Sequence, residues 1–150
     1  MTNDNQKVRW GVLGTANFGR TILPAMQRCQ FAEVSAVASR SLESAKAYAK
    51  ELAIPKAYGS YEEILRDTEV DAIYIPLPNH MHIGPAKLAL EAGKHVLCEK
   101  PISVNAEDAL ELLEFSKNSH DSKLLKLSCT AIIRSGFKQK NGSPKERLGH

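Results

Sequence analysis

Residues 11–20, GVLGTANFGR, decide how the rest of this 150-residue chain is interpreted. An apolar run that begins at Val8 stops at Gly14, and the apolar residues that follow have helical spacing. A strand that turns into a helix at glycines can hold phosphate groups on the helix N-terminus, as in the pattern G-x-G-x-x-G. Gly14 and Gly19 fit this pattern, but Ala16 stands at its middle glycine. The stretch is therefore either a dinucleotide site or a structural bend.

Each position of the pattern has its own physical role. The first glycine, Gly14, allows the tight turn out of the strand, and the third, Gly19, allows the helix and the strand to pack closely. The middle glycine lets the backbone approach a pyrophosphate, and Ala16 adds one methyl group at that point. The turn alone does not discriminate between the two interpretations, so the rest of the chain must.

Runs typical of strands alternate with runs typical of helices along most of the chain. Ser41, Ser60 with Glu63, and Asn105 with Asp108 predict helix N-caps. Strands that alternate with helices of about 10–14 residues predict an α/β fold with a doubly wound parallel sheet in a single domain. The predicted strands lie near residues 8–14, 33–39, 70–78 and 94–101, with one more possible within 122–133.

The composition predicts an ordinary globular protein of the cytoplasm. The chain is 43% hydrophobic and 25% charged, and no apolar run reaches the ~18 residues of a membrane span. Cys29, Cys98 and Cys129 form no C-x-x-C pair, which favours buried thiols in a reducing compartment over zinc or disulfides. The positive net charge of +3 comes from residues 134–150, which contain five basic residues and one acidic residue. We therefore expect neither nucleic acid nor a membrane as a partner.

The end of the second predicted strand indicates which dinucleotide would bind. A site specific for NAD favours Asp or Glu there, because a carboxylate binds the ribose 2′-hydroxyl. This chain has Ser39, Arg40 and Ser41 instead, and a guanidinium with hydroxyls suits a 2′-phosphate. The sequence therefore favours NADP over NAD if a cofactor binds. The alternative is a surface arginine beside a helix cap.

Two further segments follow predicted strands and carry reactive groups. The first segment is PLPNHMH, residues 76–82, which contains His80 and His82. These histidines are two positions apart, a spacing that does not predict a metal site. Each of them is either a cofactor contact or a loop histidine that bonds to backbone or water. In CEKP, Glu99 and Lys100 stand where an apolar strand ends, and an ammonium there can polarise a carbonyl or transfer a proton. The alternative for CEKP is a Lys-Pro pair that merely ends the strand.

Together these segments resemble the glucose–fructose oxidoreductase / inositol dehydrogenase (Gfo/Idh/MocA) family over about residues 8–127. The pairing of GKHVLCEKP with PNHMH is more specific than the turn, and GTANFGR with SRS is similar to the NADP-dependent dimeric dihydrodiol and sugar dehydrogenase branch. The resemblance is carried by GVLGTANFGR, ASRSLESAKAYAKEL, YGSYEEIL, DAIYIPLPNHMH, ALEAGKHVLCEKP and ISVNAEDALELLE, in this order.

The resemblance implies an NAD(P)-binding Rossmann domain of an oxidoreductase, with NADP as cofactor and a sugar, polyol or dihydrodiol as substrate. Lys100 is implied to be catalytic, because the lysine of the family's Glu-Lys-Pro motif assists proton transfer at the substrate hydroxyl. The implied cofactor-binding residues are Gly14, Thr15, Ala16, Asn17, Phe18 and Gly19 around the pyrophosphate, Ser39 and Arg40 at the 2′-phosphate, Pro78, Asn79 and His82 near the ribose and nicotinamide, and Glu99, Lys100 and Pro101.

The end of the chain departs from the family pattern. Family members continue into a second α/β domain with the substrate pocket and an oligomer interface, whereas residues after about 127 do not resemble that segment. We expect a truncated family member: a tail at 1–7, the Rossmann domain at 8–128 and an atypical basic tail, loop or disordered, at 129–150. Three hypotheses remain: an active oxidoreductase, a dinucleotide-binding remnant without turnover, or a partly folded remnant.

Overall fold

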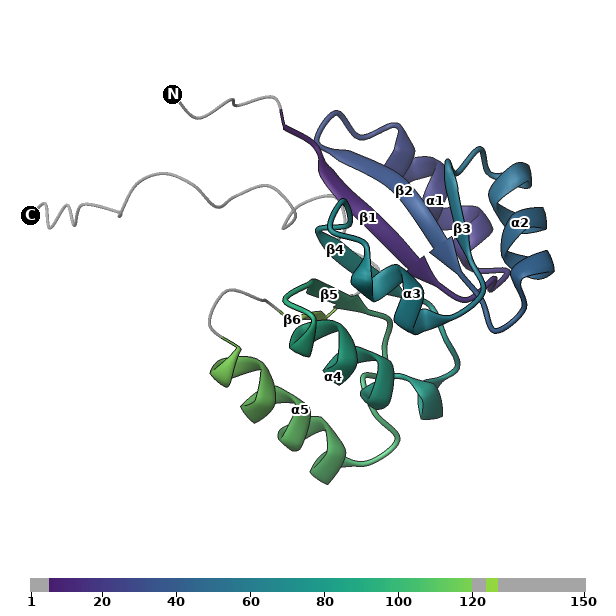
Figure 1. The fold of residues 1–150 in the computed structure, drawn as a ribbon. Coiled ribbons are helices and arrows are strands. Elements are labelled where there is room, and N and C mark those ends of the chain that lie inside the picture. The colour runs from purple at the N-terminus through teal and green to yellow at the C-terminus, as the bar shows by residue number, and fades with distance from the viewer. Residues whose placement is uncertain (1–5, 120–123, 127–150) are drawn as a thin grey trace, which may run out of the picture.

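The computed structural model describes residues 6–119 and 124–126, which form a parallel sheet covered by helices (Figure 1). In chain order the elements are β1 (Val8–Leu13), α1 (Gly19–Gln27), β2 (Ala32–Ala38), α2 (Leu42–Glu51), β3 (Lys56–Tyr58), α3 (Tyr61–Arg66), β4 (Ala72–Ile75), the 3-10 helix η1 (Asn79–Met81), α4 (Ile83–Glu91), β5 (His95–Cys98), α5 (Ala106–Asn118) and β6 (Leu124–Lys126). The strands lie in the order β3-β2-β1-β4-β5-β6 and all pairs are parallel. The predicted doubly wound α/β fold is confirmed.

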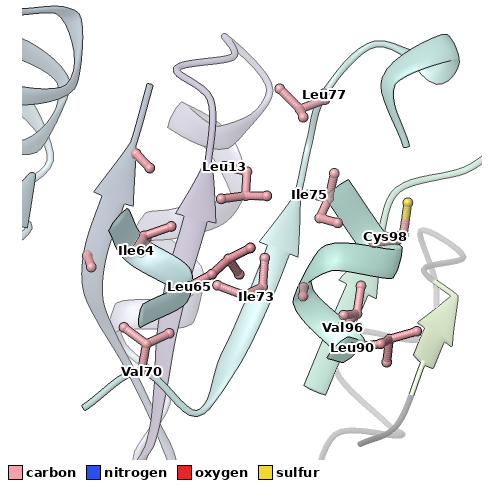
Figure 2. Packing of buried hydrophobic residues seen from close by; sticks show 14 of the residues in the cluster. Leu13, Ile64, Leu65, Val70, Ile73, Ile75, Leu77, Leu90, Val96 and Cys98 are labelled. Carbon is pink, nitrogen blue, oxygen red and sulfur yellow. The ribbon is translucent and has the colours of Figure 1, made fainter. Parts of the chain in front are cut away.

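Side chains of the central strands are buried on both faces of the sheet. Leu13, Ile73 and Ile75 belong to one apolar cluster with residues of α3 and α4 (Figure 2). Leu112 of α5 belongs to the same cluster. Val12 and Tyr74, which alternate with the residues of this cluster along β1 and β4, belong to a second cluster with residues of α1 and α2. Burial on both faces explains why these strands read as continuous apolar runs in the sequence.

The helices begin where the sequence predicts. Ser41, Ser60 and Asn105 each accept a hydrogen bond from the backbone N–H three residues later, at 3.3, 3.2 and 2.8 Å. The predicted capping box at Ser60 is displaced by one residue, because the Glu63 carboxylate accepts from the N–H of Gly59 at 3.2 Å instead. These caps satisfy N–H groups that have no partner within their own helices.

Two features of the sheet differ from the sequence prediction or extend it. β3 was not predicted, because its three half-buried residues at the sheet edge are too few to show a period. β6 lies within the run that predicted one further strand.

The predicted tail at 129–150 and Cys129 lie outside the described residues, so the domain boundaries stay a prediction. In the described part of the chain the longest helix has 13 residues, and no helix is suited to cross a bilayer.

Charged side chains fasten the edge at which β1, β4 and β5 begin. The Asp71 carboxylate accepts from the backbone N–H of Arg9 at 2.8 Å and from its guanidinium at 3.0 Å in two bonds. The nearly buried Lys94 ammonium donates to the carbonyl oxygens of Asp67 at 2.7 Å and Val70 at 2.6 Å. Because Lys94 binds backbone here, this lysine of the GKHVLCEKP segment has a structural role.

The environment of the Asp67 carboxylate makes the free energy of unfolding depend on pH in the acid range. Burial alone would raise its pKa, but hydrogen bonds from Tyr58, from the N–H of Glu69 and from the charged Lys56 hold the pKa at about 2. An unfolded aspartate has a pKa of about 3.9, so the folded carboxylate stabilises the protein above about pH 4, and this contribution is lost as the pH falls to about 2. We expect Asp67→Asn to be less stable than wild type at pH 7 and to lose less stability between pH 4 and 2. Thermal unfolding over this range measures both, with the exposed Glu62→Gln as control; parallel curves for Asp67→Asn and wild type would contradict the assignment.

Candidate functional site

The segments that follow β1, β2, β4 and β5 meet at one edge of the sheet. All strands are parallel, so their carboxyl ends lie together, and ligands of doubly wound sheets bind outside such ends. The N–H of Gly14 donates to the carbonyl of Ala38 at 2.7 Å, which joins the turn after β1 to the end of β2. The N–H of Glu99 donates to the carbonyl of Ile75 at 3.2 Å, which joins the ends of β4 and β5. The structure therefore brings the four predicted site segments to the same edge.

The turn after β1 presents four consecutive backbone N–H groups. Within residues 6–119 and 124–126, the amides of Thr15, Ala16, Asn17 and Phe18 have no protein acceptor, whereas the N–H of Gly19 donates to the Ala16 carbonyl at 3.1 Å. These groups precede the N-terminus of α1, where the helix dipole has its positive end. Donors and dipole together suit phosphate oxygens, so the turn fits an anionic group such as a pyrophosphate.

Neighbouring side chains leave no room for a Cβ atom at either glycine of the turn. Gly14 has a φ of +89°, and a Cβ there would lie 2.6 Å from Cδ2 of Leu77, the residue two positions after β4. A Cβ at Gly19 would overlap the hydroxyl of Tyr48, which comes from α2. Gly19 was expected to allow helix–strand packing, but the nearest neighbour of a Cβ at this position is the Tyr48 phenol. Tyr48 was missed by sequence reasoning; the only signal was that a buried tyrosine normally has a partner for its hydroxyl.

Arg40 lies at the end of β2, and its side chain is exposed. It makes no hydrogen bond or ion pair with the residues that the structure describes. The guanidinium of Arg20, by contrast, is bound to Glu51 at 2.7 and 3.0 Å. Burial raises the pKa of Tyr61 and the charge of Arg40 opposes that shift, which indicates that this phenol lies near Arg40. Arg40 is therefore available to an anionic ligand, and Tyr61 is a neighbour that the sequence analysis did not single out.

The structure places His82 below the surface. Its ring has no exposed area, with Nε2 at 2.6 Å from the Leu77 carbonyl and Nδ1 at 2.8 Å from the Pro101 carbonyl. The predicted contact of His82 with the ribose or nicotinamide does not fit this burial, and the alternative of a backbone-bound histidine does. The ring links the segments after β4 and β5. Pro78 and Asn79, which precede it, are exposed at the site edge.

Glu99 and Lys100, the two residues that follow β5, have different surroundings. The Glu99 carboxylate accepts a hydrogen bond from the buried phenol of Tyr74 at 2.7 Å, and burial followed by this bond raises the pKa of Tyr74. Lys100 is exposed and has no recorded partner in the described residues. Burial and the charge of Glu99 raise the pKa of the Cys98 thiol to about 12, so this cysteine is inert at neutral pH. Among the described residues, no group of three or more His, Cys, Asp or Glu could hold a metal ion.

Comparison with known proteins gives one consistent family. Residues 8–124 match the family model described as an oxidoreductase family with an NAD-binding Rossmann fold. The chain is 43% identical over 111 residues to D-xylose 1-dehydrogenase (NADP(+)) 2 of Haloferax volcanii, covering 73% of this chain and 34% of that protein. It is 42% identical over 109 residues to trans-1,2-dihydrobenzene-1,2-diol dehydrogenase of Bos taurus, covering 71% and 32%.

A solved structure shows the same similarity. The fold matches the 3-ketoreductase KijD10 of Actinomadura kijaniata in complex with NADP, with a TM-score of 0.75 and 34% identity over 81% of this chain and 38% of that chain. The chain thus spans about a third of the length of its relatives.

Two glycine substitutions test the packing around the turn. Gly19→Ala places a methyl group on the Tyr48 hydroxyl and should lower the free energy of unfolding by about 1–3 kcal/mol, as overpacking does. Gly84→Ala, in α4 with no atom within 4 Å of the added Cβ, should raise that free energy by about 0.4–1 kcal/mol. Urea denaturation measures both. A Gly19→Ala variant as stable as wild type would show that Tyr48 is not held against the turn.

Proposed function

This chain belongs to the oxidoreductase family with an NAD-binding Rossmann fold, and from that premise we propose that it binds NADP and serves hydride transfer at a secondary alcohol. The family and the Rossmann domain predicted from the motifs are confirmed. The choice of NADP, the substrate and the roles of individual residues are our proposal. We propose a sugar, polyol or dihydrodiol as substrate, because relatives carry D-xylose and dihydrobenzenediol dehydrogenase names.

The observation that carries the proposal is the row of N–H groups at residues 15–18, which have no acceptor among the described residues, together with the exposed Arg40 guanidinium at the end of the neighbouring strand. The four amides would bind the pyrophosphate, with Gly14 and Gly19 keeping the backbone close. Arg40, at the end of the neighbouring strand, would pair with the 2′-phosphate, and the hydroxyl of Ser39 would donate to it. No carboxylate stands at residues 39–41 to repel that phosphate. An NADP-bound relative supports the same choice.

Lys100 is the proposed proton-transfer group. When bound, a nicotinamide supplies the hydride donor or acceptor. On oxidation of the alcohol the neutral Lys100 amine would accept the proton of the substrate hydroxyl, and on reduction the Lys100 ammonium would donate it back. Tyr74 holds the carboxylate of the preceding residue, Glu99. Pro78 and Asn79, exposed at the end of β4, would contact the ribose and nicotinamide. His82 would position these segments through its ring and would not touch the ligand.

A second candidate function is dinucleotide binding without turnover. It is favoured by the isolation of Lys100, since no ionisable side chain contacts this ammonium in the described part of the chain. General acid–base groups are normally oriented by a neighbour.

The remaining parts of the proposal are a cytoplasmic location, a homo-oligomeric state, no nucleic-acid or membrane partner, and a Rossmann domain at residues 8–128.

Binding and turnover can be separated with NADPH and NADP. We expect NADPH fluorescence to increase on mixing with the protein, because a bound dihydronicotinamide ring contacts less water than a free one. Oxidation of a panel of polyols and dihydrodiols by NADP then tests catalysis, with Lys100→Ala as the control. Binding without oxidation would leave the second candidate; failure of any dinucleotide to bind or to raise the melting temperature would refute both.

Arg40→Ala tests the choice of cofactor. Loss of a charge-assisted bond should weaken NADPH binding by about 1–3 kcal/mol and leave NADH binding almost unchanged. Isothermal titration measures both ligands, and Arg66→Ala, an exposed arginine at the end of α3, is the matched control. Equal losses for the two dinucleotides would contradict the role of Arg40.

A further inference from the structure

We propose that Tyr48 is a positioning residue that orients the phosphate-binding turn through the Ala16 carbonyl. This inference rests on the proposed binding of a dinucleotide at that turn. Tyr48 lies on α2, not on the turn or on α1, and would strengthen binding without touching the ligand.

The Ala16 carbonyl oxygen is held from two directions. It accepts a hydrogen bond from the Tyr48 hydroxyl at 2.9 Å and another from the N–H of Gly19 at 3.1 Å. The peptide between Ala16 and Asn17 is trans, so its N–H points opposite to its C=O. Because Tyr48 draws the carbonyl toward the interior, the Asn17 N–H is turned toward the open side of the turn. One buried hydroxyl therefore orients a donor that the proposed pyrophosphate would use.

Tyr48 is itself rigidly placed. Only 2% of its surface is exposed, and it belongs to the apolar cluster beneath α1 and α2. The Arg20 guanidinium carbon lies 4.9 Å from the centre of its ring, and the same guanidinium binds Glu51 and, at 2.7 Å, the Asn17 side-chain oxygen. Burial raises the pKa of the phenol, so it stays protonated and remains a donor at neutral pH. The turn is thus attached to α2 at two neighbouring residues, at Ala16 by Tyr48 and at Asn17 through Arg20 and Glu51.

This geometry predicts a ligand dependence that a general loss of stability would not produce. A ligand with a pyrophosphate needs the oriented amides of the turn, whereas adenosine 2′-phosphate has no pyrophosphate and would use the Arg40 end only. Removal of the Tyr48 hydroxyl should therefore weaken NADPH and NADH by the same factor and leave adenosine 2′-phosphate unaffected. Arg40→Ala should give the opposite pattern, since it weakens NADPH and adenosine 2′-phosphate but not NADH.

The experiment compares Tyr48→Phe with wild type in the full chain. We expect the dissociation constants of NADPH and NADH each to rise about 3–10-fold, the effect of one hydrogen bond, and that of adenosine 2′-phosphate, measured by competition, to stay constant. Tyr58→Phe is the matched control, because it also loses a bonded phenol hydroxyl, in this case one that donates to Asp67 at 2.7 Å. Gly19→Ala, which displaces the hydroxyl without changing Tyr48, should reproduce the Tyr48→Phe pattern.

The outcomes separate this inference from the proposed function. If wild type binds no dinucleotide, the proposed function fails and this inference fails with it. If wild type binds NADPH and Tyr48→Phe binds it equally well, or loses adenosine 2′-phosphate to the same extent, only the role of Tyr48 is refuted. A loss of pyrophosphate-containing ligands alone, absent in Tyr58→Phe, supports it.

Discussion

The common direction of the six strands is the constraint on which the rest of the structure depends. Parallel strands need crossover connections, so helices cover both faces, and the central strands bury apolar side chains on both faces of the sheet. The same direction collects every strand's carboxyl end at one edge. The turn at residues 14–19, Arg40, Asn79 and Lys100 are far apart in sequence, and they become neighbours of one edge for this reason alone.

Buried polar groups beneath that edge hold its segments in place. Tyr48 binds the carbonyl of the turn, Tyr74 binds the Glu99 carboxylate, and the His82 ring lies between the carbonyls of Leu77 and Pro101. Each of these side chains is almost or fully buried. The groups that we propose for ligand binding are, by contrast, backbone amides and the exposed side chains of Arg40 and Lys100. We therefore propose a site of two levels, in which the buried groups orient the exposed ones.

Sequence patterns predicted most of the fold and only part of the site. Caps at Ser41, Ser60 and Asn105 were predictable because capping is local chemistry between residues three apart. β3 was not, because three residues at an edge carry no periodic signal. The family resemblance implied a ligand contact for His82, yet its ring is turned inward, and no local pattern determines which way a loop side chain faces.

The sequence by itself determined the alternation of strands and helices, the positions of the glycines and the charge at each strand end, because these depend on neighbouring residues. Only the tertiary structure decided that Gly19 faces Tyr48, that Glu99 is bound by Tyr74 and that Arg40 makes no hydrogen bond or ion pair with any described residue. Those contacts join residues more than 20 positions apart, and their geometry follows from how helices and strands pack rather than from any local pattern. The physical reason is that packing in three dimensions selects which polar atoms find partners inside the protein and which remain open to a ligand.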